Sequence, residues 1–230
     1  MNKPLFFVLV GSIIGWAAFT LITTEDRVNW FLDAGWVVAG VPVLLFTRKR
    51  FPLTSLVYLL LAVHAFVLIA GGYWTYEKNP VGLWLQKLFS TERNHFDRFG
   101  HFMQGFVPAI VFREIYARTS PIGKGGWLNY FSAVSCIAFS ALFELLEWGA
   151  TLLAGSSGDE FLGHQGDIWD AQWDILWAVI GCLVSLLALS SIHRRQLAQL
   201  LPSESTGFGD TTLRPLAFDT AKRVSNSVNL

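Results

Sequence analysis

The chain has 230 residues, of which 53% are hydrophobic and only 15% are charged, and its formal net charge is zero. Soluble domains carry about 25% charged residues, so this composition excludes an ordinary soluble domain and indicates an integral membrane protein. The absence of a basic surplus also argues against a nucleic-acid-binding protein.

Six segments are apolar and long enough to cross about 30 Å of hydrocarbon, which takes about 20 helical residues. They predict transmembrane helices at residues 4–23, 28–46, 53–76, 95–117, 127–155 and 168–192. The first apolar run exceeds the ~7 to 15 residues of a signal-peptide core, so we expect this helix to be retained. The sequence thus predicts an all-α, polytopic membrane protein with one bundle of about six helices over residues 1–192. A polar tail, residues 193–230, follows and is expected to be disordered.

The positions of the basic residues predict the orientation of this bundle. Arg48, Lys49 and Arg50 crowd the second loop, and Arg194 and Arg195 follow the last helix. By the positive-inside rule, both termini should lie in the cytoplasm. The long third loop then lies outside, where residues 81–89 have the pattern of a short amphipathic helix on the membrane surface.

Acidic residues and a histidine recur inside three of these hydrophobic segments, where an ionised carboxylate costs roughly 2.5 to 3.5 kcal/mol. Steps of three or four residues place them on one face of each helix. These polar faces comprise Asp97, His101 and Gln104 in the fourth helix, Glu144 and Glu147 in the fifth, and Asp167, Asp170 and Asp174 in the sixth. The predicted orientation puts all of them within roughly the outermost 15 Å of the span. We therefore expect one shared site that opens outward.

The inner halves of the last three helices are expected to be mostly apolar. Their main polar atoms belong to Cys136, Cys182 and Ser185. The two cysteines are expected to be small core residues rather than a disulfide. On the sixth helix, Gly181 and Ser185 would let a neighbouring helix approach closely.

Carboxylates that outnumber the one good base, His101, favour recruitment of a divalent cation. The expected ligands are His101, Glu144, Asp170 and Asp174, the expected general base is Glu147 or Asp97, and the accessory candidates are Asp167, His64, Gln104 and Tyr73. For His64 and Tyr73, a core histidine and an aromatic membrane anchor are the simpler explanations. Mixed carboxylate and imidazole ligands suit several divalent ions, so the metal stays open, as do the substrate and the oligomeric state.

Such a site predicts a hydrolase or transferase that acts on a lipid-linked or other envelope molecule in contact with membrane lipid. Two alternatives remain open. One is a proton- or cation-coupled transporter, because intramembrane carboxylates and histidines mark such pathways. The other is a structural or binding protein whose polar core only fixes the packing of the helices.

Several stretches carry a family resemblance. They read RNHFDRFGHF at residues 93–102, QGFVP at 104–108, FELLEW at 143–148 and QGDIWDAQWD at 165–174, with GYWTY at 72–76. The chain thereby resembles the YjdF-type bacterial inner-membrane proteins, an uncharacterised family, over about residues 5 to 192. The resemblance implies a multi-pass protein of the bacterial inner (cytoplasmic) membrane.

A more distant similarity involves the order D-[KR]-x-x-H-F, E-x-x-[EQ] and D-x-x-x-[ND]. The matching positions are Asp97, Arg98, His101, Phe102, Glu144, Glu147, Asp170 and Asp174. This order is similar to that of the VanZ-like membrane proteins, one of which is linked to glycopeptide-antibiotic resistance, although Trp177 stands where that pattern has a glycine. The similarity implies an envelope-facing role in lipid-linked or cell-wall chemistry.

Overall fold

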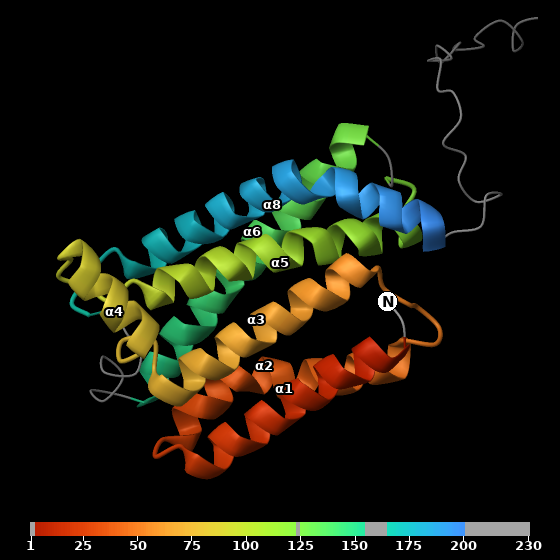
Figure 1. Cartoon of the computed structure of the whole chain (residues 1–230). Helices are drawn as coiled ribbons and strands as arrows, with labels where there is room; N and C mark the ends of the chain where they lie inside the picture. Colours follow the sequence, from red (N-terminus) through yellow and green to blue (C-terminus); the bar gives the residue numbers. More distant parts are fainter. Residues whose placement is uncertain (1–2, 123–124, 155–164, 201–230) are drawn as a thin grey trace, which may run out of the picture.

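The computed structural model describes residues 3–122, 125–154 and 165–200. The helices are α1 (Lys3–Thr23), α2 (Arg27–Thr47), α3 (Ser55–Trp74), α4 (Pro80–Phe89), α5 (Phe96–Thr119), α6 (Gly125–Ala154) and α8 (Asp170–Leu200) (Figure 1). The described residues form no strand, which confirms the predicted all-α class. Within the described ranges, five helices, α1, α2, α3, α6 and α8, are long and apolar enough to cross a membrane. The chain is therefore a polytopic membrane protein.

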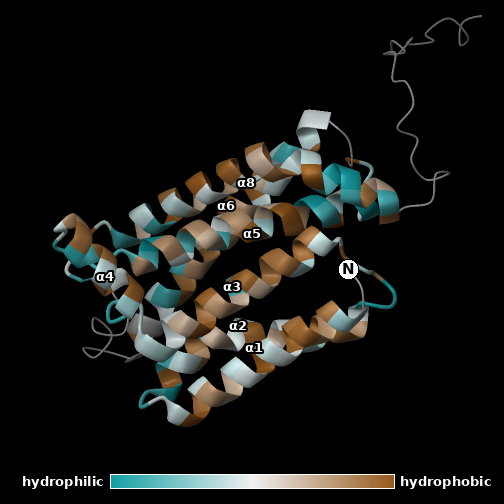
Figure 2. Ribbon diagram, viewed as in Figure 1, coloured by the Kyte–Doolittle hydropathy of each residue, from teal (hydrophilic) through white to brown (hydrophobic). Residues whose placement is uncertain are grey.

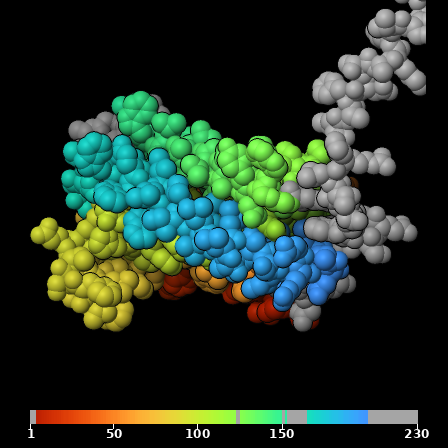
Figure 3. All heavy atoms as spheres, turned by 90° about the horizontal axis from the view of Figure 1, so that it is seen from above, coloured from red at the N-terminus to blue at the C-terminus, as the bar shows by residue number. Residues whose placement is uncertain are grey.

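The remaining long helix, α5, occupies the centre of the bundle. It carries five charged residues and is contacted by α3, α6 and α8, while α1 and α2 pack against α3 on the far side (Figure 1). Seen from above, α8 runs along one face of the bundle beside α6 (Figure 3). Because α5 is surrounded by other helices, its charged side chains can pair with protein groups instead of facing lipid.

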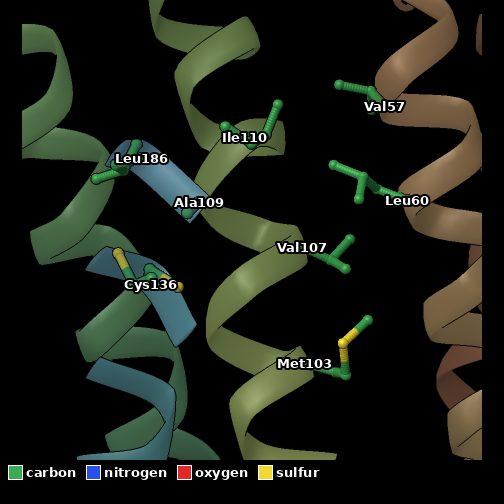
Figure 4. Packing of buried hydrophobic residues seen from close by; sticks show 9 residues of the cluster. Val57, Leu60, Met103, Val107, Ala109, Ile110, Cys136 and Leu186 are labelled. Atoms are coloured by element: carbon green, nitrogen blue, oxygen red, sulfur yellow. The ribbon is translucent and has the colours of Figure 1, made fainter. Parts of the chain in front are cut away.

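Apolar side chains of α5 form the main core with α3, α6 and α8. Val57 and Leu60 of α3 belong to this cluster with Val107 and Ile110 of α5 (Figure 4). Cys136 belongs to it as well and is a free thiol, as is Cys182, so the expectation of small core cysteines is confirmed. This core keeps α5 in a fixed register against its neighbours.

The backbones of α5 and α8 touch at two glycines. A Cβ atom on Gly105 would lie 1.8 Å from the carbonyl oxygen of Ala178, and one on Gly181 would lie 2.0 Å from that of Phe102. No other residue fits at either position. The predicted close approach at Gly181 is therefore confirmed, and it sets the two polar faces of these helices against each other.

Polar residues gather at both ends of the bundle (Figure 2). We call the end that bears α4 the outer end and the opposite end the inner end, following the predicted orientation. The short helix expected at residues 81–89 is present as α4, which begins after the N-cap Asn79. Asn94 holds it in place, because its amide group donates to the carbonyl oxygens of Glu77 and Asn79.

The predicted end of the last helix was wrong. The sequence placed it at residue 192, whereas α8 continues to Leu200. The extra two turns are helical because they still have partners: His193 and Leu197 are buried, and the side chain of Gln196 accepts a hydrogen bond from the backbone of Leu56. The rest of the predicted tail, residues 201–230, lies outside the described residues.

Candidate functional site

Three buried side chains converge at the outer end of the bundle. Asp97 and His101 come from the first two turns of α5, and Asp174 comes from the second turn of α8. Each offers one ligand atom, and these atoms all lie within 4.8 Å of one another. A divalent ion with ligand distances of about 2.0 to 2.2 Å could be reached by small shifts of these side chains. We call these three residues the outer cluster.

Hydrogen bonding determines which nitrogen of His101 faces the outer cluster. Its Nδ1 atom lies 2.8 Å from Oε1 of Gln104 and 3.5 Å from Oε1 of Glu144, and both oxygens are acceptors. The proton therefore belongs on Nδ1. The other nitrogen, Nε2, faces Asp97 at 3.5 Å and Asp174 at 3.9 Å. This arrangement leaves a lone pair available to a metal, with Gln104 and Glu144 as the supporting groups.

Asp174 supplies the second indication of a ligand site. Its side chain is buried, and its Oδ1 atom has no hydrogen-bond partner among the described residues. A buried carboxylate oxygen without a partner is costly. The other oxygen, Oδ2, is the one that faces His101, so a cation bound by both oxygens of Asp174 would satisfy Oδ1.

Arg93 neutralises part of the negative charge of the acidic residues at the outer end. Its guanidinium lies 3.2 Å from Asp97 and 3.6 Å from Asp167, and it also contacts Asp170. Sequence reasoning missed this role and counted His101 as the one good base. The available signal was the spacing of Arg93 and Asp97, four residues apart at the start of a helix. Asp170, expected as a metal ligand, lies against Arg93 instead of within the outer cluster.

A cavity of about 240 Å³ begins at the outer cluster and runs inward between α1, α2, α3, α5 and α6. Its polar end is lined by Asp33, Tyr76, Asp97, His101, Gln104 and Glu147, and the rest of the wall is almost entirely apolar. Glu147, expected as a general base, thus faces the same space as the outer cluster. His64 lines the cavity further in.

Two lining residues, Asp33 and Tyr76, were not among the predicted site residues. Asp33 lies at the outer end of α2, where the sequence favours an interfacial position over a place in the site. The ring of Tyr76 fits against Gly71 and Gly100, where any larger residue would collide with it. Burial, together with the nearby carboxylates of Asp33 and Asp97, holds the pKa of the Tyr76 phenol well above its ordinary value, so this group is a hydrogen-bond donor.

Tyr73, the other aromatic candidate on this side, is not brought to the outer cluster. Its hydroxyl contacts Thr23 of α1 at 3.3 Å, and its ring packs against Trp16 and Trp74. Asp167 also lies outside the cluster, where it pairs with Arg98 at 3.3 Å.

The inner end is not apolar, contrary to the sequence-based expectation. Glu114 and His193 are fully buried there, and Nε2 of His193 lies 3.0 Å from Oε2 of Glu114. The carboxylate of Glu114 also accepts hydrogen bonds from Thr54 and Arg118. Arg113 donates to Nδ1 of His193 at 2.6 Å. The expectation failed because these partners are up to 80 positions apart in the sequence. We call these five residues the inner network.

Fold and site together define a multi-pass membrane protein with a buried carboxylate–histidine cluster at one end. The chain belongs to the family described as "Predicted membrane protein (DUF2238)", which it matches over residues 5–195. It is 41% identical over 179 residues to the inner membrane protein YjdF of Escherichia coli (strain K12), covering 78% of this chain and 86% of that relative. No solved structure matches the chain.

These comparisons confirm the resemblance to the YjdF-type proteins, and the chain is a multi-pass protein of the inner membrane. The similarity to the VanZ-like proteins stays a prediction.

Proposed function

We propose that the protein is an intramembrane metalloenzyme, a hydrolase or transferase whose site opens outward and acts on a lipid-linked envelope molecule. The observation that carries this proposal is the outer cluster, in which ligand atoms of Asp97, His101 and Asp174 lie within 4.8 Å of one another. The Oδ1 atom of buried Asp174, which has no hydrogen-bond partner in the described part of the chain, supports it independently.

The residues in and around the outer cluster suggest which of them bind the metal, which orient a ligand and which acts as the general base. One imidazole and two carboxylates suit Mn²⁺, Fe²⁺ or Zn²⁺, and an ion of this kind supplies polarisation of a phosphoryl or carbonyl oxygen. Gln104 and Glu144 orient His101 through Nδ1. Glu147 lines the cavity next to the outer cluster and is the candidate general base, because it is not needed as a ligand.

The position of the site favours a membrane-embedded substrate. The outer cluster lies at the end of a mostly apolar cavity. Of the two helices that carry it, α8 is apolar enough to cross a bilayer, and α5 is packed against α3, α6 and α8. A substrate with a polar group at headgroup depth and an apolar body would satisfy both parts of this space.

Metal binding by the purified full-length protein tests the proposal. We expect wild-type protein in detergent to bind about one Mn²⁺ per chain in isothermal titration calorimetry, and Asp174→Asn to bind it at least about tenfold more weakly. Glu92→Gln removes the same charge from an exposed position at the outer end and should bind like wild type. A wild-type protein that binds no Mn²⁺, Fe²⁺ or Zn²⁺ would refute the proposal.

A second candidate function is cation-coupled transport, and one observation favours it. Polar groups occur at three depths, in the outer cluster, at His64 in the cavity wall and in the inner network. His101 of the outer cluster and Glu114 of the inner network are thirteen positions apart on α5, which corresponds to about 20 Å along the helix axis. Proteoliposomes would decide: proton or Mn²⁺ flux that His64→Leu abolishes would support a transporter, and its absence in wild type would exclude one.

A further inference from the structure

The shape of the cavity indicates what kind of molecule fills it. On α2, its wall extends from Asp33 to Leu44, and on α5 from Asp97 to Pro108. Each stretch spans eleven steps along a helix, or about 16 Å. The cavity is therefore long for its volume of about 240 Å³, which suits an extended chain better than a compact solute.

The chemistry of the cavity changes along its length. Carboxylates, an imidazole and a phenol line the outer end. Further in, the wall is mostly aliphatic, with Val10, Val41, Leu44 and Leu61, and it also contains His64 and Tyr58. Cavities walled by aliphatic side chains exclude water and accept apolar ligands. The occupant that matches both ends has a polar head and a hydrocarbon tail.

We infer that the cavity holds one hydrocarbon chain of a phosphate-headed lipid, with the phosphate at the outer cluster. The inference of a hydrocarbon chain follows from the shape of the cavity and its mostly apolar wall. The inference of a phosphate rests on the proposed function, because a divalent ion held by few protein ligands has coordination positions left that phosphate oxygens can fill, as they do for Mg²⁺.

The side of the cavity between α2 and α6 is the route that we infer for a hydrocarbon chain from the bilayer. Trp36 of α2 contacts Phe139 and Phe143 of α6 through its ring, with centroid distances of 6.0 and 6.3 Å. All three rings line the cavity, and Trp36 is also exposed on the surface of the bundle. These aromatic side chains form the cavity wall between α2 and α6, so a hydrocarbon chain that enters here passes beside Trp36.

Two glycines on α2 provide a matched pair of variants. A Cβ atom on Gly40 or on Gly35 would meet no atom within 4 Å, so both positions tolerate a larger side chain. Gly40 lines the cavity and Gly35 does not. Gly40→Leu therefore fills the cavity, and Gly35→Leu is its control. Ala65→Leu fills the same space from α3 and serves as a second blocking variant.

The test uses full-length protein in nanodiscs that contain phosphatidic acid with a diazirine in the middle of one acyl chain. After photolysis, mass spectrometry maps the adducts. We expect adducts on cavity residues of α2 and α3, such as Val41 and Leu61, in wild type and in Gly35→Leu. They should fall by about tenfold or more in Gly40→Leu and Ala65→Leu, because the added side chain occupies the space of the chain.

A second arm replaces phosphatidic acid with the matching diacylglycerol, which has the same chains and no phosphate. We expect weaker labelling of the cavity by this lipid. Equal labelling of Val41 and Leu61 in Gly40→Leu and wild type would refute the inference as a whole. Equal labelling by the two lipids would refute the phosphate-headed occupant. Metal binding is measured separately by calorimetry, so the two proposals can fail independently. The protein can lack metal binding while the acyl chain still labels the cavity, and it can bind metal while the acyl chain does not label the cavity.

Discussion

His101 and Gln104 lie one helical turn apart on α5, with Nδ1 of the histidine 2.8 Å from Oε1 of the glutamine. This hydrogen bond assigns the imidazole proton to Nδ1 and turns Nε2 toward Asp97 and Asp174. In the proposed metal site, Gln104 is thus the residue that orients His101, although Gln104 itself lies outside the group of ligand atoms.

Gln104→Leu should therefore weaken metal binding while leaving every ligand in place. Loss of a group that orients a metal-binding histidine costs about 10- to 100-fold in affinity, and calorimetry with Mn²⁺ measures it. Gln172→Leu is the control, because Gln172 is exposed on α8 near the same end of the bundle. An unchanged affinity in Gln104→Leu would show that His101 is not held by this contact.

The contact between α5 and α8 should be sensitive to a single methyl group. Gly105→Ala and Gly181→Ala each force a Cβ atom to within about 2 Å of a facing carbonyl oxygen, at 1.8 Å and 2.0 Å. We expect a loss of about 1 to 3 kcal/mol in the free energy of unfolding. We also expect weaker Mn²⁺ binding, because Asp97 lies on α5 and Asp174 on α8, and a wider separation of these helices would move the two ligands apart.

Gly35→Ala is the matched control for the two crossing glycines. Its Cβ atom meets nothing within 4 Å, and alanine favours helix over glycine. Thermal unfolding in detergent should give an unchanged or slightly raised midpoint for Gly35→Ala and a clear decrease for the other two. Equal behaviour of all three variants would contradict the close contact of the helices.

The sequence predicted those features that depend on local periodicity. Apolar runs predicted the all-α polytopic bundle, and steps of three and four residues put Asp97, His101 and Gln104 on one face of α5, where all three line the cavity. The small residue at Gly181 predicted close packing for the same reason. These features need only one helix at a time to be recognised.

Features that depend on partners distant in sequence could not be predicted in this way. Tyr76 belongs to a segment between helices, and only the folded chain brings it to the acids of α5 and brings Arg93 to Asp170 of α8. Arg113 and Glu114 look like residues near a membrane interface, yet both are buried because His193, some 80 positions later, lies beside them. Spacing along one helix contains no information about such contacts.

The inner network should contribute stability without contributing to the metal site. Glu114→Ala removes the common acceptor of Thr54, His193 and Arg118, and breaking a buried charged network costs about 3 to 5 kcal/mol. Glu114→Gln keeps one acceptor oxygen and should cost less. Thermal unfolding measures both, with the exposed Glu77→Ala as control.

Metal binding separates this structural role from a functional one. Glu114 lies about 20 Å along α5 from His101, so folded Glu114→Gln should bind Mn²⁺ with wild-type affinity. A tenfold decrease would instead connect the two ends of the bundle and would favour the transporter.

Arg93 and a metal should compete for the same carboxylates. The guanidinium contacts Asp97 and Asp170, so Arg93→Met removes a positive charge next to the outer cluster and leaves these acids to repel one another. Without metal, the variant should unfold at a lower temperature than wild type. With Mn²⁺, its affinity should rise by about tenfold or more, because a charge in contact with a ligand is worth several kcal/mol at an effective dielectric constant of about 20.

Arg98→Met provides the comparison for this prediction. Arg98 carries the same charge at the same end, but it pairs with Asp167 and lies over the ring of Trp173. Its loss should lower stability slightly and leave the Mn²⁺ affinity within about twofold of wild type, since exposed or partly exposed pairs contribute little. If Arg93→Met weakened Mn²⁺ binding instead, the guanidinium would be holding Asp97 in position for the ion. The idea that Arg93 and a metal compete for the same carboxylates would then have to be abandoned.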